Sequence, residues 1–291
     1  MTTAVEAVIL GILAGAVYAL FSVGLSVSFG VLRLVNFAHG DFVMLGMYFG
    51  YFAAHSWGLP IGAVIGSSVI PAALLGYVVY QVFFRGTGQG GNHDQLLIAI
   101  GLSILLENGT LEIFGESARS VNELSVQTYH LGPIYLPEPQ LLAAAVAVVL
   151  VAAFDLGLRK TSFGRAVRAV VADRTVAELQ GIRPNLVFLG TFMASIVSAA
   201  IAGIVLLGYL PVTPEVGGNL ILIGFISVVL GGAGDVRGTA AAAVIVGLTE
   251  SLVTTYWAAS VQDVVAYALF ILVAILRPRG LFNRGAVEAG R

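Results

Sequence analysis

Long apolar runs follow one another along almost the whole chain, and they constrain its fold more than any other feature. The runs cover residues 5–29, 42–54, 61–84, 96–114, 141–158, 186–210, 220–230, 239–257 and 261–276. A helix needs about 20 apolar residues to cross the hydrocarbon core of a bilayer, which is roughly 30 Å thick. Because that core offers the backbone no water, we predict an all-α polytopic membrane protein with eight or nine transmembrane helices.

The composition agrees with a membrane protein. Hydrophobic residues make up 58% of the 291 residues and charged residues only 10%, against about 25% charged residues in soluble domains. The net charge of −2 and the lack of a basic tail argue against nucleic acid as a partner, whereas membrane lipid is expected. The first six residues carry no positive side chain, so we expect the first run to stay in the mature protein. We therefore expect one transmembrane domain over residues 1–291.

One polar loop, residues 159–184, is rich in positive charge. Its basic residues are Arg159, Lys160, Arg165, Arg168, Arg174 and Arg183. Cytoplasmic loops carry an excess of Lys and Arg, so this loop is expected in the cytoplasm. Arg277, Arg279 and Arg284 place the C-terminus there too, and the four crossings predicted between the two segments agree with this. Counting backwards puts residues 115–139 and the N-terminus outside.

Two of the apolar runs are too short to cross the membrane alone. Residues 42–54 and 220–230 contain 13 and 11 residues, so each crossing needs its neighbouring polar, glycine-bearing stretch. We predict broken or short helices near residues 30–54 and 220–238. Paired interruptions at membrane depth point to a transport pathway, because freed backbone is tolerated where it lines a cavity or is buried in protein. Two tight cytoplasmic turns are the alternative.

The first break contains the sequence NFAHGDF, residues 36–42. His39 and Asp41 are two residues apart, which points them to different faces of a helix and makes them a poor acid–base pair. We expect Asp41 to cap a helix that begins at Phe42, and Gly40 to supply unusual backbone angles. A contact of Asp41 with substrate or a partner chain is the alternative. Asn36 and His39 are expected to face a pathway or an adjoining helix.

Three more polar side chains lie inside apolar runs: Glu107, Asn108 and Glu250. A carboxylate inside a span costs several kcal/mol unless it is paired, protonated or facing water, so each is a candidate for the translocation pathway. An interhelical hydrogen bond or a position near the outer interface is the alternative. Together with the first break, they give seven candidate pathway residues: Asn36, His39, Gly40, Asp41, Glu107, Asn108 and Glu250.

The signatures of common catalytic sites are missing. The only lysine is Lys160, and the glycine-rich residues 86–92 lack the lysine of a nucleotide-binding P-loop. The HExxH and GxSxG motifs do not occur, and there is no cysteine. The four histidines, His39, His55, His93 and His130, have no spacing typical of metal ligands. We expect neither an enzyme nor a metal or cofactor site on this chain.

The loop over residues 159–184 has the pattern of two short helices. Thr161 or Ser162 can cap a helix that starts near Phe163, and Ala166, Ala169, Val170 and Asp173 share one face of it. Residues 175–178 read as a capping box, Gly181 as a helix stop and Pro184 as a terminator. The small-residue face is expected to dock into a groove on another protein, with Arg165 and Arg168 free to pair with acidic groups. A solvated basic loop is the alternative.

Three segments in this order resemble one known family: residues 24–46, 161–182 and 229–252, which read GLSVSFGVLRLVNFAHGDFVMLG, TSFGRAVRAVVADRTVAELQGI and VLGGAGDVRGTAAAAVIVGLTESL. They are similar to the LivH-type permease subunits of branched-chain amino acid ABC importers. The similarity extends over nearly the whole chain. It implies a multi-pass protein of the bacterial cytoplasmic membrane.

The resemblance also implies partners. They are a LivM-like permease, two LivG/LivF-like ATPases that bind ATP and magnesium, and an extracytoplasmic solute-binding protein that delivers substrate. It identifies residues 159–184 as the coupling-helix loop that receives the ATPase motion. The coupling residues it implies are Gly164, Arg165, Arg168, Ala169, Asp173, Ala177 and Gly181.

The resulting hypothesis is ATP-driven import of branched-chain or other small neutral amino acids by alternating access. Relatives of the same architecture carry urea, short amides or small organic acids, which are the alternative substrates. A proton-coupled secondary transporter or channel that uses Glu107 and Glu250 is the alternative of another class. An intramembrane enzyme is the third, but no nucleophile is paired with a base.

Overall fold

The computed structural model describes residues 2–32, 36–85, 92–121, 128–131, 134–208, 210–258, 261–277 and 280–282. The helices are α1 (Thr2–Leu32), α2 (His39–Trp57), α3 (Ile61–Val79), the π-helix η1 (Tyr80–Phe84), α4 (Asn92–Phe114), α5 (Glu138–Lys160), α6 (Ser162–Ala172), α7 (Arg174–Leu179), α8 (Pro184–Leu206), α9 (Val216–Gly231), α10 (Val236–Tyr256) and α11 (Gln262–Leu276). One small hairpin, β1 (Thr128–Leu131) with β2 (Ile134–Pro137), pairs antiparallel just before α5.

The helices confirm an all-α polytopic membrane protein. Within the described residues, six segments are long and apolar enough to cross a bilayer: Ala4–Leu32, Ile61–Phe84, Asp94–Phe114, Glu138–Lys160, Pro184–Leu206 and Val236–Tyr256. Val216–Gly231 and Val264–Leu276 are shorter apolar helices, and α2 adds a helix of 19 residues. Together they match the eight or nine helices predicted.

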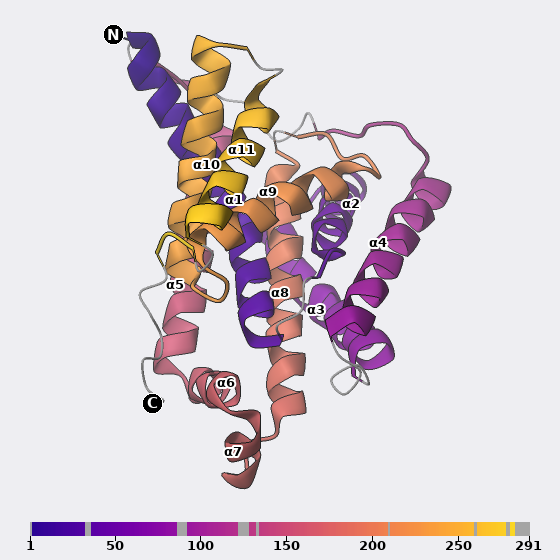
Figure 1. Cartoon of the computed structure of the whole chain (residues 1–291). Helices are drawn as coiled ribbons and strands as arrows, with labels where there is room; N and C mark the ends of the chain where they lie inside the picture. The colour runs from indigo at the N-terminus through magenta and orange to yellow at the C-terminus, as the bar shows by residue number, and fades with distance from the viewer. Residues whose placement is uncertain are drawn as a thin grey trace.

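The helix α1 is the central element of the bundle, with α10, α8, α5 and α9 packed around it (Figure 1). Its contact with α10 is very close, because both helices present glycines. A Cβ on Gly15 would collide with the Cα of Val244, and one on Gly247 would collide with the backbone nitrogen of Gly15. Small residues allow helix backbones to approach in this way inside membranes, where packing rather than hydrophobicity holds helices together.

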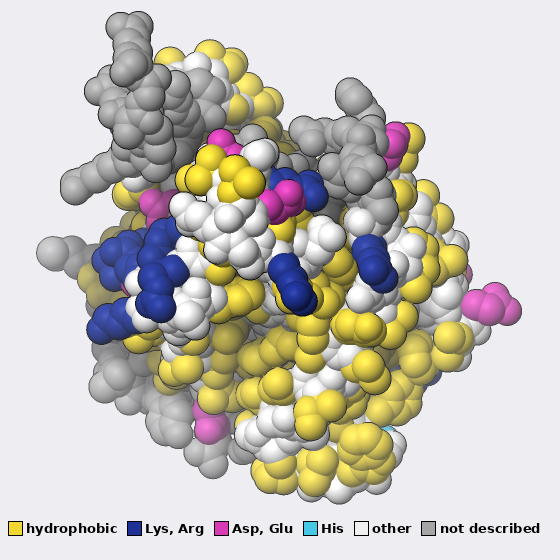
Figure 2. Space-filling view, turned by 90° about the horizontal axis from the view of Figure 1, so that it is seen from below, with side chains coloured by type: hydrophobic (Ala, Val, Ile, Leu, Met, Phe, Trp, Pro, Cys, Tyr) yellow, Lys and Arg dark blue, Asp and Glu magenta, His cyan; other side chains and the backbone are white. Residues whose placement is uncertain are grey.

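The end of the molecule with α6 and α7 lies opposite the start of α1 (Figure 1). The two short helices project beyond the ends of the long ones, between α5 and α8. Seen from this end, Lys and Arg side chains gather on the face, with hydrophobic side chains around it (Figure 2). The basic loop predicted from the sequence thus forms one pole of the structure. Arg279 and Arg284 lie outside the described residues.

At the opposite end, Arg119 in the polar loop after α4 connects this loop to α2, to the end of α4 and to the segment after α8. Its backbone exchanges two hydrogen bonds with Val212, which follows α8, at N–O distances of 3.0 and 2.8 Å. Its guanidinium donates to the carbonyl of Phe114 at 2.7 Å and lies over the rings of Tyr51 and Phe52. Part of the predicted outer loop, residues 122–127 and 132–133, lies outside the described residues.

Candidate functional site

The first turn of α2 lies deep in the bundle beside the middle of α1. The Nε2 of His39 is 2.9 Å from the carbonyl oxygen of Phe21, which is eleven residues before the end of α1. At about 1.5 Å per residue, this point is roughly 16 Å along α1 from its C-terminal end. The start of α2 therefore lies back inside the protein rather than beyond the end of α1. This confirms a broken helix near residues 30–54.

His39 joins three helices and is almost completely buried, with 1% of its surface exposed. A carbonyl can only accept, so Nε2 donates to Phe21 and the other ring nitrogen is left to face α8. There the Oγ of Ser195 is 3.5 Å from Nδ1 and donates to the carbonyl of Gly24 at 2.9 Å. His39 therefore faces adjoining helices, which is one of the two environments expected for it.

Asp41 does not cap α2, and this prediction is wrong. The helix begins at His39 rather than Phe42, and Ala38 occupies the N-cap position without a side-chain hydrogen bond. The Asp41 carboxylate instead accepts a hydrogen bond of 2.5 Å from the Oγ of Ser103 on α4. The sequence pattern misplaced the helix start by one turn because the polar residues before Phe42 are buried against other helices.

Gly40 is helical, so the expectation of unusual backbone angles is also wrong. The lack of a side chain at Gly40 allows the backbones of α2 and α9 to approach each other closely. A Cβ at this position would collide with the carbonyl oxygen of Gly217 in the first turn of α9. A Cβ on Gly217 would in turn lie 2.5 Å from Oδ1 of Asp41. The first turns of α2 and α9 therefore meet backbone to backbone beside a carboxylate.

This junction has favourable electrostatics for negative charge. Each helix N-terminus carries the equivalent of about half a positive charge and unpaired backbone N–H groups. Two such termini meet beside Asp41, whose exposed fraction is 2%. They offset part of the cost of burying its carboxylate, which the Ser103 hydrogen bond reduces further.

Asn36, at the entrance to α2, is completely buried, and neither atom of its side-chain amide has a hydrogen-bond partner among the described residues. Leaving a buried polar group unpaired costs about 1–3 kcal/mol. Its backbone carbonyl accepts from His39 N at 3.1 Å, which fixes the turn. The side chain is therefore a free donor and acceptor close to the junction.

The two predicted pathway residues on α4, Glu107 and Asn108, lie in different environments. Glu107 is half-buried and lies one turn after Ser103, on the face that meets Asp41. Asn108 is exposed and its Nδ2 donates to the carbonyl of Ile104 in the same helix, at 2.8 Å. The structure thus brings Glu107 towards the junction and turns Asn108 away.

Glu250 lies on α10, with 7% of its surface exposed. The hydroxyl of Tyr18 on α1 donates to its Oε2 at 2.5 Å. Tyr18 is one turn from Phe21, the partner of His39, and their rings are in edge contact at 6.2 Å between centroids. Glu250 therefore makes an interhelical hydrogen bond, which was the alternative to a pathway role. Within the described residues, no group of three His, Asp or Glu side chains could hold a metal ion.

The second break, between α9 and α10, confirms the short helices predicted near residues 220–238. Gly232 and Gly234 have φ of 98° and 86°, values that favour glycine. The carboxylate of Asp235 caps α10 by accepting from the backbone N–H of Arg237 and Gly238, each at 3.0 Å. The Oγ of Ser26 on α1 accepts from Gly234 N at 3.3 Å. Both breaks are therefore fastened to α1.

The site contains residues that the sequence did not single out. They are Tyr18, Ser26, Ser103, Asp155, Ser195 and Arg237. The serines give weak signals, because a serine in a membrane helix can also bond its own backbone. The Asp155–Arg237 pair joins α5 to α10, and only Asp155 was detectable as a charge inside an apolar run.

The loop over residues 159–184 forms the two predicted short helices, α6 and α7, which we call the elbow, but its details differ from the prediction. Thr161 caps α6, accepting from Gly164 N at 3.0 Å, as one of the two expected caps. The capping box at residues 175–178 is wrong: Asp173 caps α7 by accepting from Val176 N at 3.0 Å, and Glu178 pairs with Arg174 at 3.2 Å. Gly181, with φ of 82°, confirms the helix stop.

The expected docking face of α6 is wrong as well. Val167, Val170 and Ala177 are buried, and Ala166 and Ala169 pack with them against the protein itself. Gly164 allows α6 to pack closely on the end of α5, because a Cβ at this position would collide with the carbonyl of Leu158. Arg168 donates a hydrogen bond to the same carbonyl. The surface left for a partner is the opposite one, with Arg165 exposed. Val176 and Leu179 are 48% and 84% exposed on the same elbow.

Comparison with known proteins identifies the family. The model of the branched-chain amino acid transport system/permease component family matches residues 7–274, which includes both helix breaks and the elbow. The chain belongs to this family.

Individual members of this permease family are similar over almost their full length. The chain is 28% identical to the high-affinity branched-chain amino acid transport system permease protein BraD of Pseudomonas aeruginosa, over 96% of this chain and 95% of that protein. It is 30% identical to the corresponding LivH proteins of Salmonella typhimurium and Escherichia coli, with the same coverage. No solved structure matches the chain.

Proposed function

We propose that this chain is the transmembrane permease subunit of an ATP-driven importer for branched-chain or other small neutral amino acids. The observation that carries the proposal is the family match over residues 7–274, together with relatives whose names state branched-chain amino acid transport. In this proposal the chain has no catalytic role, and partner subunits bind and hydrolyse ATP with magnesium.

The proposed assembly pairs the chain with a LivM-like permease, two LivG/LivF-like ATPases and an extracytoplasmic binding protein. The elbow of α6 and α7 is the proposed ATPase contact, supported by its projection from one pole and by the exposed Arg165, Val176 and Leu179. The N-terminus is proposed to lie outside and the C-terminus in the cytoplasm, since the pole with α6 and α7 is basic and α1 begins at the other.

The proposed pathway passes the junction of α2 and α9. An amino acid is a zwitterion, and this junction supplies both complementary charges: the carboxylates of Asp41 and Glu107 for the ammonium group, and two helix N-termini for the carboxylate. The free amide of Asn36 adds a donor and an acceptor. Alternating access would part the two first turns, which are held together by close backbone contact rather than by interlocked side chains.

The experiment is reconstitution of the complete complex in liposomes. Radiolabelled leucine should enter only when binding protein, both ATPases and ATP are present. Urea, short amides and small organic acids serve as competitors that test the alternative substrates. Uptake by this chain and its partner permease driven by a pH gradient, with no ATPase present, would instead establish a proton-coupled transporter.

A further inference from the structure

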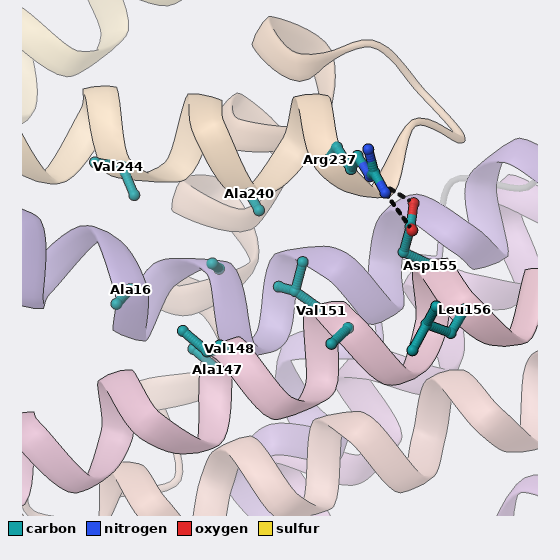
Figure 3. A pocket seen from close by; sticks show the side chains of 11 residues that line it. Ala16, Ala147, Val148, Val151, Asp155, Leu156, Arg237, Ala240 and Val244 are labelled. Atoms are coloured by element: carbon teal, nitrogen blue, oxygen red, sulfur yellow. Dashed lines mark hydrogen bonds and ion pairs between the residues drawn. The ribbon is translucent and has the colours of Figure 1, made fainter.

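A groove with a volume of about 450 Å³ lies between α5 and α10 (Figure 3). Its floor is Ala16 and Ala19 of α1, and its walls include Ala147 and Val151 of α5 and Ala240 and Val244 of α10. Val148 at its edge is 69% exposed. Because exposed apolar side chains at this depth face lipid in a membrane, the groove opens towards the hydrocarbon.

One end of the groove is charged. The Nε and Nη2 of Arg237 donate to the two carboxylate oxygens of Asp155 at 2.9 and 2.8 Å (Figure 3). Arg159 pairs with the same carboxylate at 2.8 Å through its Nε. The two arginine side chains are 64% and 59% exposed, whereas that of Asp155 is 9% exposed. A single buried carboxylate therefore orients two guanidinium groups that keep most of their N–H donors free.

The charge at this end does not balance. Lys160 follows Arg159 at the end of α5, and Arg168 donates to the carbonyl of Leu158. The second nearby carboxylate, Asp235, is engaged in capping α10. Positive charge therefore exceeds negative charge, and it lies on the pole where basic side chains gather (Figure 2). Guanidinium groups in this arrangement suit the oxygens of a phosphate.

The length of the groove matches one leaflet of a bilayer. Its α5 wall extends from Ala147 to Leu156 and its α10 wall from Arg237 to Val244. At about 1.5 Å per residue, each wall is roughly 10–14 Å long. One leaflet contributes about 15 Å of hydrocarbon. A charged end at the depth of the lipid headgroups therefore continues into an apolar channel as deep as a lipid chain.

We propose that this groove binds an anionic phospholipid. One acyl chain lies over Ala16 and Ala19, and the phosphate is held by Arg159 and Arg237. The lipid belongs to the leaflet on the side of α6 and α7, and it links α5 to α10, the helix that follows the second break. This inference concerns the lipid-facing surface and holds whichever solute is transported.

The test of the apolar part is native mass spectrometry of the full-length protein with phosphatidylglycerol and with phosphatidylcholine. One phosphatidylglycerol should be retained in preference to phosphatidylcholine. Ala152→Phe fills the groove and should abolish this preference. Ala153→Phe is the matched control, because Ala153 is exposed on the same helix and does not line the groove.

The charged part is tested with Arg159→Gln, which leaves Asp155 paired with Arg237. Retention of phosphatidylglycerol should fall roughly tenfold, as expected for the loss of a hydrogen bond between charged groups. Arg85→Gln is the control: Arg85 is exposed at the end of η1, away from the groove lining. Circular dichroism and size-exclusion profiles establish that each variant is folded.

Equal retention of both lipids, or equal loss in Ala152→Phe and Ala153→Phe, would overturn the proposal. Displacement of the lipid by inorganic phosphate would show that the arginines bind free anions instead. The sequence has no cysteine, so Ala152→Cys creates a unique thiol. Its crosslinking to a partner permease in the assembled complex would show that a protein helix, not a lipid, occupies the groove.

Discussion

At the scale of single residues, the interior of this protein is organised by polar contacts between helices that are far apart in the chain. Asp41 is bonded to Ser103, Glu250 to Tyr18, and His39 to the backbone of Phe21. Each contact satisfies a group that would otherwise be costly inside a membrane. Their partners are serine, tyrosine and backbone, which carry little signal in a sequence.

The Asp41 contact gives a first prediction. Ser103→Ala removes the donor and leaves a buried carboxylate with one hydrogen bond fewer, so the protein should lose about 1–3 kcal/mol of stability. The measurement is thermal unfolding in detergent. Ser67→Ala is the control, because exposed Ser67 only bonds the carbonyl of Val64 in its own helix. Equal stability of the two variants would show that the Asp41–Ser103 contact does not contribute.

Two neighbouring glycines give a second prediction. Gly217→Ala should reduce transport and stability, because its Cβ would lie 2.5 Å from Oδ1 and 2.9 Å from the backbone nitrogen of Asp41. At Gly218 nothing lies within 4 Å of a Cβ, so Gly218→Ala should be neutral, or stabilising by up to about 1 kcal/mol through helix propensity. Uptake assays and thermal unfolding measure both. If Gly217→Ala transports normally, α2 and α9 do not approach as closely as described.

At the scale of elements, the helix ends decide how the elbow is built. Asp173 ends α6 through its backbone N–H, which donates to the carbonyl of Ala169, and caps α7 with its side chain, so one residue connects the two helices. The apolar stripe Val167, Val170 and Ala177 then seats both against the bundle. The pattern of residues 161–184 predicted two helices correctly, but Thr175–Glu178 matched a capping box by chance because Asp173 competes for the same helix start.

This gives a third prediction, on the cap. Asp173→Ala should loosen α7 by about 1 kcal/mol, the usual cost of losing an N-cap. Thr175→Ala should change little, although the capping-box pattern would give it the same cost. Hydrogen exchange of the α7 amides distinguishes the two variants. Faster exchange in Thr175→Ala than in Asp173→Ala would show that the capping box, not Asp173, stabilises the start of α7.

At the scale of the whole molecule, both helix breaks are anchored on α1. The start of α2 bonds to Phe21, and the turn before α10 bonds to Ser26. The apolar stripe of the elbow belongs to one buried cluster with Val31 of α1 and Val236 of α10, and α6 contacts α1, α5 and α8 directly. Packing therefore connects the elbow to α1, on which both breaks are anchored.

The proposed ATPase contact gives a fourth prediction at this scale. Arg165→Glu reverses an exposed charge on the elbow and should weaken ATPase co-purification and substrate-stimulated ATP hydrolysis together, without changing the fold. Arg85→Glu is a control with the same change of charge at an exposed position outside the elbow. Normal co-purification and hydrolysis with Arg165→Glu would mean that the ATPases dock elsewhere.

Apolar run lengths and charge positions are enough to predict the fold class, the helix order, the two breaks and the basic pole. The start of α2 at His39, the contact of Gly40 with Gly217 and the inward-facing small residues of α6 are apparent only in the folded protein. Run lengths and charges are local properties, whereas helix starts and glycine contacts depend on which distant backbone lies close by.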